Sequence, residues 1–144
     1  SGGVYLGGTG SANKLEDYEE GTFNTTVTVG GGSVTSNSKT LYYTKVGSLV
    51  NLHGRLNFSA ISSPTGFINI TLPFAPNNTP TPVGSIQFEN SASKNSNDFT
   101  FYVREDLGTA RIYVADVGAT SSSGANAQQI TTSSQISISL AYRV

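Results

Sequence analysis

The sequence predicts an all-β protein, folded as an antiparallel β-sandwich. Apolar and polar residues alternate along about eight short segments, which is the pattern of half-buried strands. Turn residues separate these segments at intervals typical of sandwiches, and no segment carries the longer period of a helix. Two packed antiparallel sheets in jelly-roll-like order fit this pattern best, and a small closed β-barrel is the alternative.

Each predicted strand is bounded by a change in composition. The predicted strands are residues 23–29, 41–46, 49–58, 68–72, 83–89, 99–104, 111–115 and 135–143. The segments between them are rich in Gly, Pro, Ser and Asn, which favour turns and loops. These predicted connections are residues 30–39, 47–48, 62–66, 76–82, 90–97, 105–108 and 118–129.

Residues 49–58 form the most regular of the predicted strands. The side chains on its apolar side are Val50, Leu52, Leu56 and Phe58. Gly54 falls on the same side, which predicts a bulge or a close approach of another backbone. Such regular alternation indicates one face on a core and one face towards water or a partner.

The composition excludes several classes of function. Charged residues make up 12% of the 144 residues and the net charge is −1, whereas a typical domain is about one quarter charged. The Lys and Arg residues are spread along the chain rather than clustered, which argues against nucleic-acid binding. No apolar run approaches the roughly 18 residues that cross a bilayer, so no membrane insertion is expected. Without Cys there is no disulfide or thiol chemistry.

Residues 15–23, LEDYEEGTF, hold four of the nine carboxylates. Bunched acids could bind calcium or divide the roles of a general acid and a general base. Calcium loops, however, alternate their ligands with spacers around a central glycine, and this stretch has no such frame. The sequence therefore favours a structural elbow whose acids cap backbone N–H groups, and it predicts no metal site.

The same stretch resembles a junction that recurs in tail-fibre and related structural proteins of bacteriophages. The usual pattern there is leucine, two acids, tyrosine, two glutamates, glycine, threonine and an aromatic residue. Residues 43–47 (YTKVG), 72–74 (LPF) and 141–144 (AYRV) also resemble elements of that family. Phe23 stands where the pattern often has tryptophan.

This resemblance implies a C-terminal domain of a tail-fibre or receptor-binding protein, located in the virion and extracellular when it acts. It implies a homotrimer that attaches to the host-cell surface through a glycan or another receptor. Residues 1–21 are expected to be an extended lead-in from an upstream fibre domain, and residues 22–144 the β-sandwich domain. The alternative functions are a purely structural trimerisation cap and a glycan-cleaving tailspike domain.

No catalytic residues and no cofactor are predicted, so the chain is not expected to be an enzyme. His53 is the only histidine, so any Ser-His-Asp arrangement would need it. It lies in mid-strand, no G-x-S-x-G elbow is present, and an exposed or interface histidine is the expected reading. The acids outside the acidic stretch lie near loops or strand ends: Glu89, Asp98, Glu105, Asp106 and Asp116.

Two outward faces are candidates for binding. The hairpin of residues 99–115 would present Tyr102, Arg104, Arg111 and Tyr113. Tyrosine rings stack on sugars and arginine binds carboxylates or phosphates, so this patch suits an acidic surface glycan. A subunit interface or a plain solvated face are the alternatives.

The last strand supplies the second face. Its outward residues Ser137, Ser139 and Ala141 are small and uncharged. An uncharged exposed strand promotes aggregation unless it is covered. The sequence therefore predicts that this face is buried in an oligomer.

Overall fold

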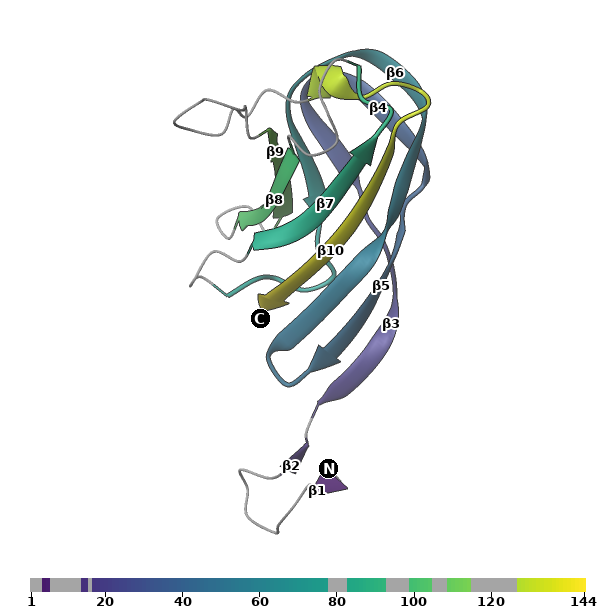
Figure 1. The fold of residues 1–144 in the computed structure, drawn as a ribbon. Helices are drawn as coiled ribbons and strands as arrows, with labels where there is room; N and C mark the ends of the chain where they lie inside the picture. Colours follow the sequence, from purple (N-terminus) through teal and green to yellow (C-terminus); the bar gives the residue numbers. More distant parts are fainter. Residues whose placement is uncertain are drawn as a thin grey trace.

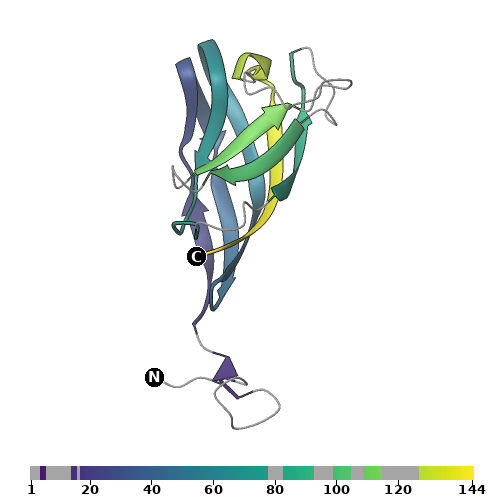
Figure 2. The ribbon, with the colours of Figure 1, turned by 90° about the vertical axis from the view of Figure 1, so that its left-hand side faces the viewer.

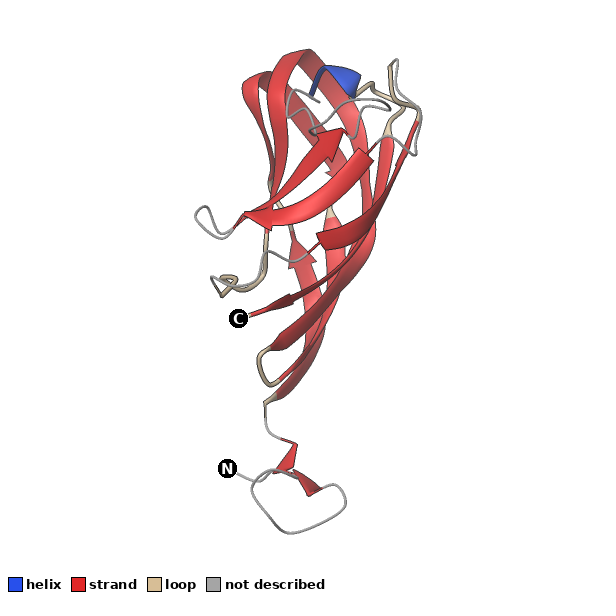
Figure 3. Cartoon of the chain, turned by 60° about the vertical axis from the view of Figure 1, so that its left-hand side comes forward, coloured by secondary structure: helices blue, strands red, loops and turns tan. Residues whose placement is uncertain are grey.

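The computed structural model describes the backbone of residues 4–5, 14–15, 17–77, 83–92, 99–104, 109–114 and 127–144. Side chains are described for residues 17–77, 84–92, 109–112 and 127–144. Most of these residues lie in strands (Figure 3). The predicted all-β class is therefore confirmed.

The strands follow one another along the chain with one short helical turn, η4 (Ala127–Gln129). They are β1 (Val4–Tyr5), β2 (Lys14–Leu15), β3 (Tyr18–Asn24), β4 (Val27–Ser38), β5 (Thr40–Val46), β6 (Leu49–Thr71), β7 (Val83–Glu89), β8 (Phe99–Arg104), β9 (Thr109–Val114) and β10 (Gln135–Arg143). β1 and β2 pair with each other in a small separate sheet. The division into lead-in and sandwich domain stays a prediction, although β3 already pairs with β5 from Tyr18 onwards.

The remaining strands form two antiparallel layers. One layer holds β3, β5, the first part of β6, β10 and β7 in that order. The other layer holds the first part of β4, the last part of β6, β9 and β8. β8 and β9 lie to the left of the longer strands in Figure 1 and in front of them in Figure 2. Among the described strands, β3 and β4 leave open edges, so the molecule is a sandwich rather than a closed barrel.

The layers are joined on one side by the pairing of β7 with β8 and on the other by a bent two-stranded ribbon. β4 and β6 pair from Val27 with Ile70 to Ser38 with Asn57, and the register shifts repeatedly after Val29. Figure 1 shows both strands arching together over one end of the molecule. Each of the two strands therefore contributes to both layers.

Glycine makes this bend possible. A Cβ atom on Gly66 would lie 3.0 Å from the Cα of Gly30. A Cβ on Gly32 would lie 2.2 Å from the carbonyl oxygen of Ser63, and Gly32 has a φ of +69°. The predictions of a strand end at residues 30–32, a loop at 33–39 and a turn at 62–66 are therefore wrong, because the paired strands continue through the bend.

The first predicted strand is divided for a related reason. Residues 23–29 alternate between buried and exposed as expected, but the strand breaks at Thr25 and Thr26. Thr25 is fully buried, and its hydroxyl donates to the carbonyl oxygen of Thr71 at 2.8 Å. The chain passes here from the first layer to the second.

The core lies between the layers. Its fully buried members include Leu41, Val50, Leu52, Leu56, Ile68, Ile70, Ile112 and Ile136. Burying a side chain of this size contributes roughly 1.5–3 kcal/mol. The close backbone approach predicted at Gly54 is confirmed, because a Cβ there would lie 3.1 Å from both the Leu41 Cα and the Thr40 carbonyl oxygen.

The chain after β6 is anchored on the end of β10. The Tyr142 hydroxyl lies 3.3 Å from the carbonyl oxygen and 3.4 Å from the amide nitrogen of Phe74. Tyr142 is 2% exposed. Burial raises the pKa of Tyr142 to about 12, against the opposing effect of the hydrogen bond to the Phe74 backbone.

Gly32→Ala tests the bend. The new Cβ would collide with the Ser62 and Ser63 carbonyl oxygens, so the substitution should lower the free energy of unfolding by at least ~2 kcal/mol more than a matched control. That control is Gly47→Ala, whose φ is +56° but whose added Cβ meets nothing within 4 Å, and it should cost about 1 kcal/mol. Urea unfolding measures both. An equal decrease in the free energy of unfolding for Gly32→Ala and Gly47→Ala would show that the bend does not need glycine.

Tyr142 should make the fold sensitive to alkaline pH. Its pKa rises from 10.0 to about 12 on folding, so the stability linked to its neutral form is complete below pH 10 and is lost between about pH 10 and 12. Over this pH range the free energy of unfolding of Tyr142→Phe should fall by about 1–2 kcal/mol less than that of the wild type, because phenylalanine has no proton to lose. Urea unfolding at several pH values measures the difference. Tyr42→Phe, at a tyrosine that is 53% exposed, should follow the wild type, and parallel curves for all three proteins would refute the assignment.

Candidate functional site

Residues 18–23 of the acidic stretch lie in the edge strand β3, whose side chains point to opposite faces. Glu19 lies on the inner side with Tyr43 of β5, and Asp17, which precedes β3 with a φ of +58°, reaches Lys45 there. Tyr18 and Glu20 lie on the outer side. The stretch therefore contributes to two different surfaces.

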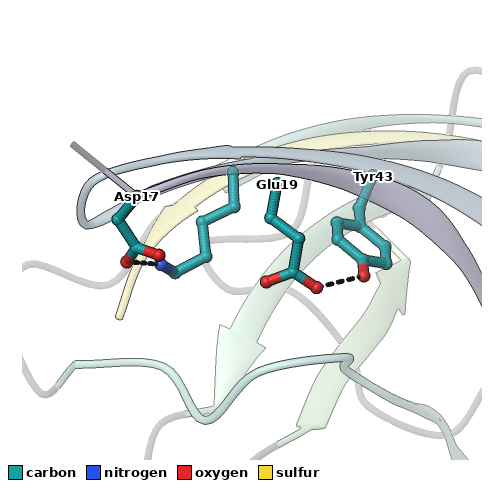
Figure 4. A network of polar contacts seen from close by, with 4 residues as sticks. Asp17, Glu19 and Tyr43 are labelled. Atoms are coloured by element: carbon teal, nitrogen blue, oxygen red, sulfur yellow. Dashed lines mark hydrogen bonds and ion pairs between the residues drawn. The ribbon is translucent and has the colours of Figure 1, made fainter. Parts of the chain in front are cut away.

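On the inner side the acids bind side chains, not backbone N–H groups as predicted. Lys45, whose side chain is 11% exposed, forms an ion pair with Asp17. The Tyr43 hydroxyl donates to Glu19 Oε1 at 2.6 Å (Figure 4), and this hydrogen bond raises the pKa of Tyr43. The Phe74 ring packs edge-on against Tyr43 with ring centres 5.1 Å apart. These contacts close the base of the core, which is a structural role.

On the outer side lies a broad surface that we call the outer sheet face. It consists of the outward side chains of β3, β5, the first part of β6, β10 and β7. One row across it runs from Thr22 through Tyr42 and His53 to Ser139 and Ser85. β10 alternates as predicted, with Ser139 and Ala141 exposed.

An apolar row crosses one end of the outer sheet face. Tyr18 lies opposite Val46, and Val46 lies opposite Leu49. Their exposed fractions are 56%, 37% and 43%. Adjacent exposed apolar side chains of this kind favour contact with a partner.

Tyr42 and His53 form a stacked pair on the same face. They are directly opposite each other in the β5–β6 ladder, and their ring centres lie 5.7 Å apart with an angle of 19° between the planes. Tyr42 is 53% exposed. His53 is exposed, as predicted, and its one described contact is this stack.

A groove of about 390 Å³ runs beside this pair, over β3 and β5. Glu20, Thr22, Tyr42 and Thr44 line it. The Tyr18 hydroxyl donates to Glu20 Oε2 at 2.7 Å, which raises the pKa of Tyr18. In the described part of the chain, Glu20 Oε1 makes no hydrogen bond, so it can accept one from a ligand.

The predicted ligand patch is described only in part. Tyr102 of β8 and Arg111 of β9 lie opposite each other, but the side chains of Tyr102, Arg104 and Tyr113 fall outside the described residues. Arg111 is 9% exposed, so its expected exposure is wrong. Its Nε donates to Asn69 Oδ1 at 2.8 Å, and its guanidinium carbon lies 3.8 Å from the centre of the Phe67 ring. Ligand binding by this patch stays a prediction.

The described residues hold no group of three or more His, Asp or Glu placed to bind a metal ion. Glu89 lies at the end of β7. The acids Asp98, Glu105, Asp106 and Asp116 fall outside the described residues. In the part of the chain that is described, no helix has the length and apolar character needed to cross a membrane.

The comparisons with known proteins yield a similar fold. No protein-family model matches the chain, and no curated protein sequence does. The crystal structure of the Dettilon tailspike protein (gp208) superposes on 88% of this chain with a TM-score of 0.69 and 18% sequence identity. The match covers 24% of that protein, so this chain spans about a quarter of its length. At this level of identity the likeness establishes a shared fold: this chain is built like one segment of a tailspike.

Proposed function

We propose that this chain is an attachment domain of a bacteriophage tail fibre or tailspike, and that it binds a glycan on the host-cell surface. The observation that carries the proposal is the fold shared with a tailspike over 88% of the chain. The resemblance of residues 15–23 to tail-fibre junctions supports it independently. Both would place the protein in the virion tail.

The surface chemistry supports a binding role. The long strands form a rigid scaffold, and rigid scaffolds commonly present the contacts of binding proteins. The outer sheet face exposes Tyr18 and Tyr42, and tyrosine supplies a flat apolar ring together with a polar tip. Tyr102 and Tyr113 on the other layer are the second candidate contact.

We also propose that the domain assembles as a homotrimer through the β10 side of the outer sheet face, with Val46 and Leu49 at its end, so that the groove over β3 and β5 stays open to a ligand. Ser139 and Ala141 are small enough to let another chain approach β10 closely. The apolar row of Tyr18, Val46 and Leu49 continues in register to Arg143 of β10. Covering this surface would remove exposed apolar side chains from water.

A purely structural trimerisation cap is the second candidate, because the same apolar row supports it without any ligand. A glycan-cleaving domain would need two carboxylates about 5–10 Å apart across a groove. The three possibilities differ in whether cells bind the domain and whether oligosaccharides are released.

The attachment role predicts saturable binding to bacteria. Fluorescently labelled domain should bind strains that carry a recognised surface polysaccharide and should lose this binding on isogenic strains that lack it, as measured by flow cytometry. If the β8–β9 patch contributes, Tyr102→Ala combined with Tyr113→Ala should weaken binding, while Ser133→Ala should not. Binding to no strain, or equal binding with and without the polysaccharide, would leave the structural cap as the better description. New reducing ends in the supernatant would identify a cleaving enzyme.

The trimer predicts a mass of three times the 15.0 kDa chain in light scattering. Ser139→Arg should dissociate it, because the substitution puts a charge into the close contact at β10. Gln128→Arg, at an exposed position of η4, is the matched control and should leave the mass unchanged. A monomeric wild type, or a Ser139→Arg protein that stays trimeric, would contradict the proposed interface.

A further inference from the structure

We infer that the groove beside Tyr42 binds one uncharged pyranose unit of a polysaccharide. This inference rests on the proposed attachment function and names a site and a ligand class for it. The groove volume of about 390 Å³ lies within the range of roughly 300–1,000 Å³ found for small-molecule sites. The chemistry of its walls selects the ligand.

The Tyr42 ring supplies the apolar wall. His53 on β6 covers one face of this ring. Thr22 of β3 lies opposite Tyr42 on the other side of β5, and Thr22 and His53 both line the groove beside the ring. A ring with one face packed and one face free is held in a fixed orientation. The C–H face of a pyranose can stack on it, since the face of an aromatic ring carries partial negative charge.

Polar groups stand around this ring at the positions that sugar hydroxyls would reach. Glu20 Oε1 can accept a hydrogen bond from a sugar hydroxyl, and a bond to a carboxylate is stronger than one between neutral groups. Tyr18 fixes the orientation of the carboxylate through its Oε2 atom. The hydroxyls of Thr22 and Thr44 line the groove and can donate or accept. An apolar wall with a few placed polar groups is the usual composition of a ligand site.

Side chains on the inner side of the sheet support the backbone that forms the floor of the groove. Gly21 lines the groove, and the ring of Tyr43 covers its opposite side, where a Cβ would lie 2.9 Å from the Tyr43 hydroxyl oxygen. The Tyr43 hydroxyl is itself bound to Glu19. β3 is therefore fixed against β5 on the inner side, which keeps the groove formed before a ligand arrives.

The charge of the groove favours an uncharged sugar. Among the described residues that line it, Glu20 is the only acid, His53 stacks on Tyr42, and there is no Lys or Arg. Arg55, on the same outer face, is bound to Gln135 at 2.9 Å and Ser137 at 3.2 Å on the β10 side. Lys45 lies on the inner side with Asp17. A sugar carboxylate would meet Glu20 without a compensating cation and would be repelled.

Amide chemical shifts of the ¹⁵N-labelled 144-residue chain test the inference. The probes are methyl glucoside, methyl galactoside, methyl mannoside and methyl N-acetylglucosaminide, with methyl glucuronide as the acidic counterpart. At least one neutral glycoside should shift the amide signals of Gly21, Thr22 and Thr44 with saturation, and the glucuronide should bind at least about tenfold more weakly than that glycoside. No shift at these amides with any neutral glycoside would overturn the inference, as would glucuronide binding of equal strength.

Variants identify the groups responsible. Tyr42→Ala should weaken the binding by about tenfold or more, whereas Tyr42→Phe, which keeps the ring, should bind within about twofold of the wild type. Glu20→Gln should reduce the difference in affinity between the neutral glycoside and the glucuronide, because it removes the negative charge that repels the glucuronide. Gln128→Ala removes an exposed side chain of η4, away from the outer sheet face, and should change nothing. Tyr42 is largely exposed, so its loss should leave the fold intact, which thermal unfolding checks. Full binding by Tyr42→Ala would refute the site.

This outcome is separable from that of the attachment function. If Tyr42→Ala loses glycoside binding and the wild type still binds no cells, the groove inference holds and attachment fails. If the wild type binds cells and Tyr42→Ala binds them equally well without any glycoside shift, attachment holds and the groove inference fails.

Discussion

The fold depends on the bend in the β4–β6 ribbon. A single pair of strands can contribute to both layers only if the two paired backbones approach each other closely at the bend. The contact between Gly30 and Gly66 shows how close this approach is. Because β6 is continuous through the bend, the position of one layer fixes the other. β5 and β10 pair with one end of β6, whereas β9 pairs with the far end. The layers therefore enclose the core, to which η4 adds the buried Ala127.

Alternation of side chains predicted which residues face the core, but not where the strands end. The inward residues of residues 49–58 are buried as expected because a period of two depends only on local strand geometry. Sequence alone predicts that the strands end at residues 30–32 and 62–66, because glycine, serine and proline favour turns in isolation. Here the glycines serve a contact between residues distant in sequence, and a single sequence does not reveal that pairing. The predicted exposure of Arg111 is wrong for a similar reason, since the side chain is buried against Phe67, which lies on another strand.

The Tyr42–His53 pair could have been predicted. Gly47 and Ser48 form the two-residue turn expected from sequence, and such a turn sets Val46 opposite Leu49. Counting back from there brings Tyr42 opposite His53. What sequence could not provide is the third strand of the groove. β3 and β5 are separated by all of β4, so no short turn fixes their register, and the position of Glu20 beside Tyr42 emerges only from the structure.

The acidic stretch connects the core to the groove. Adjacent residues of one strand face opposite ways, so Glu19 holds Tyr43 on the inner side while Glu20 lines the groove on the outer side. The inner contacts add side-chain bonds between this edge strand and β5, its one neighbour among the described strands. A free edge strand would let the groove wall move, and a wall that moves must be ordered again on binding, at a cost in affinity. Asp17 and Glu19 thus have a structural role on the inner side of the sheet, and Glu20 is left to line the groove on the outer side.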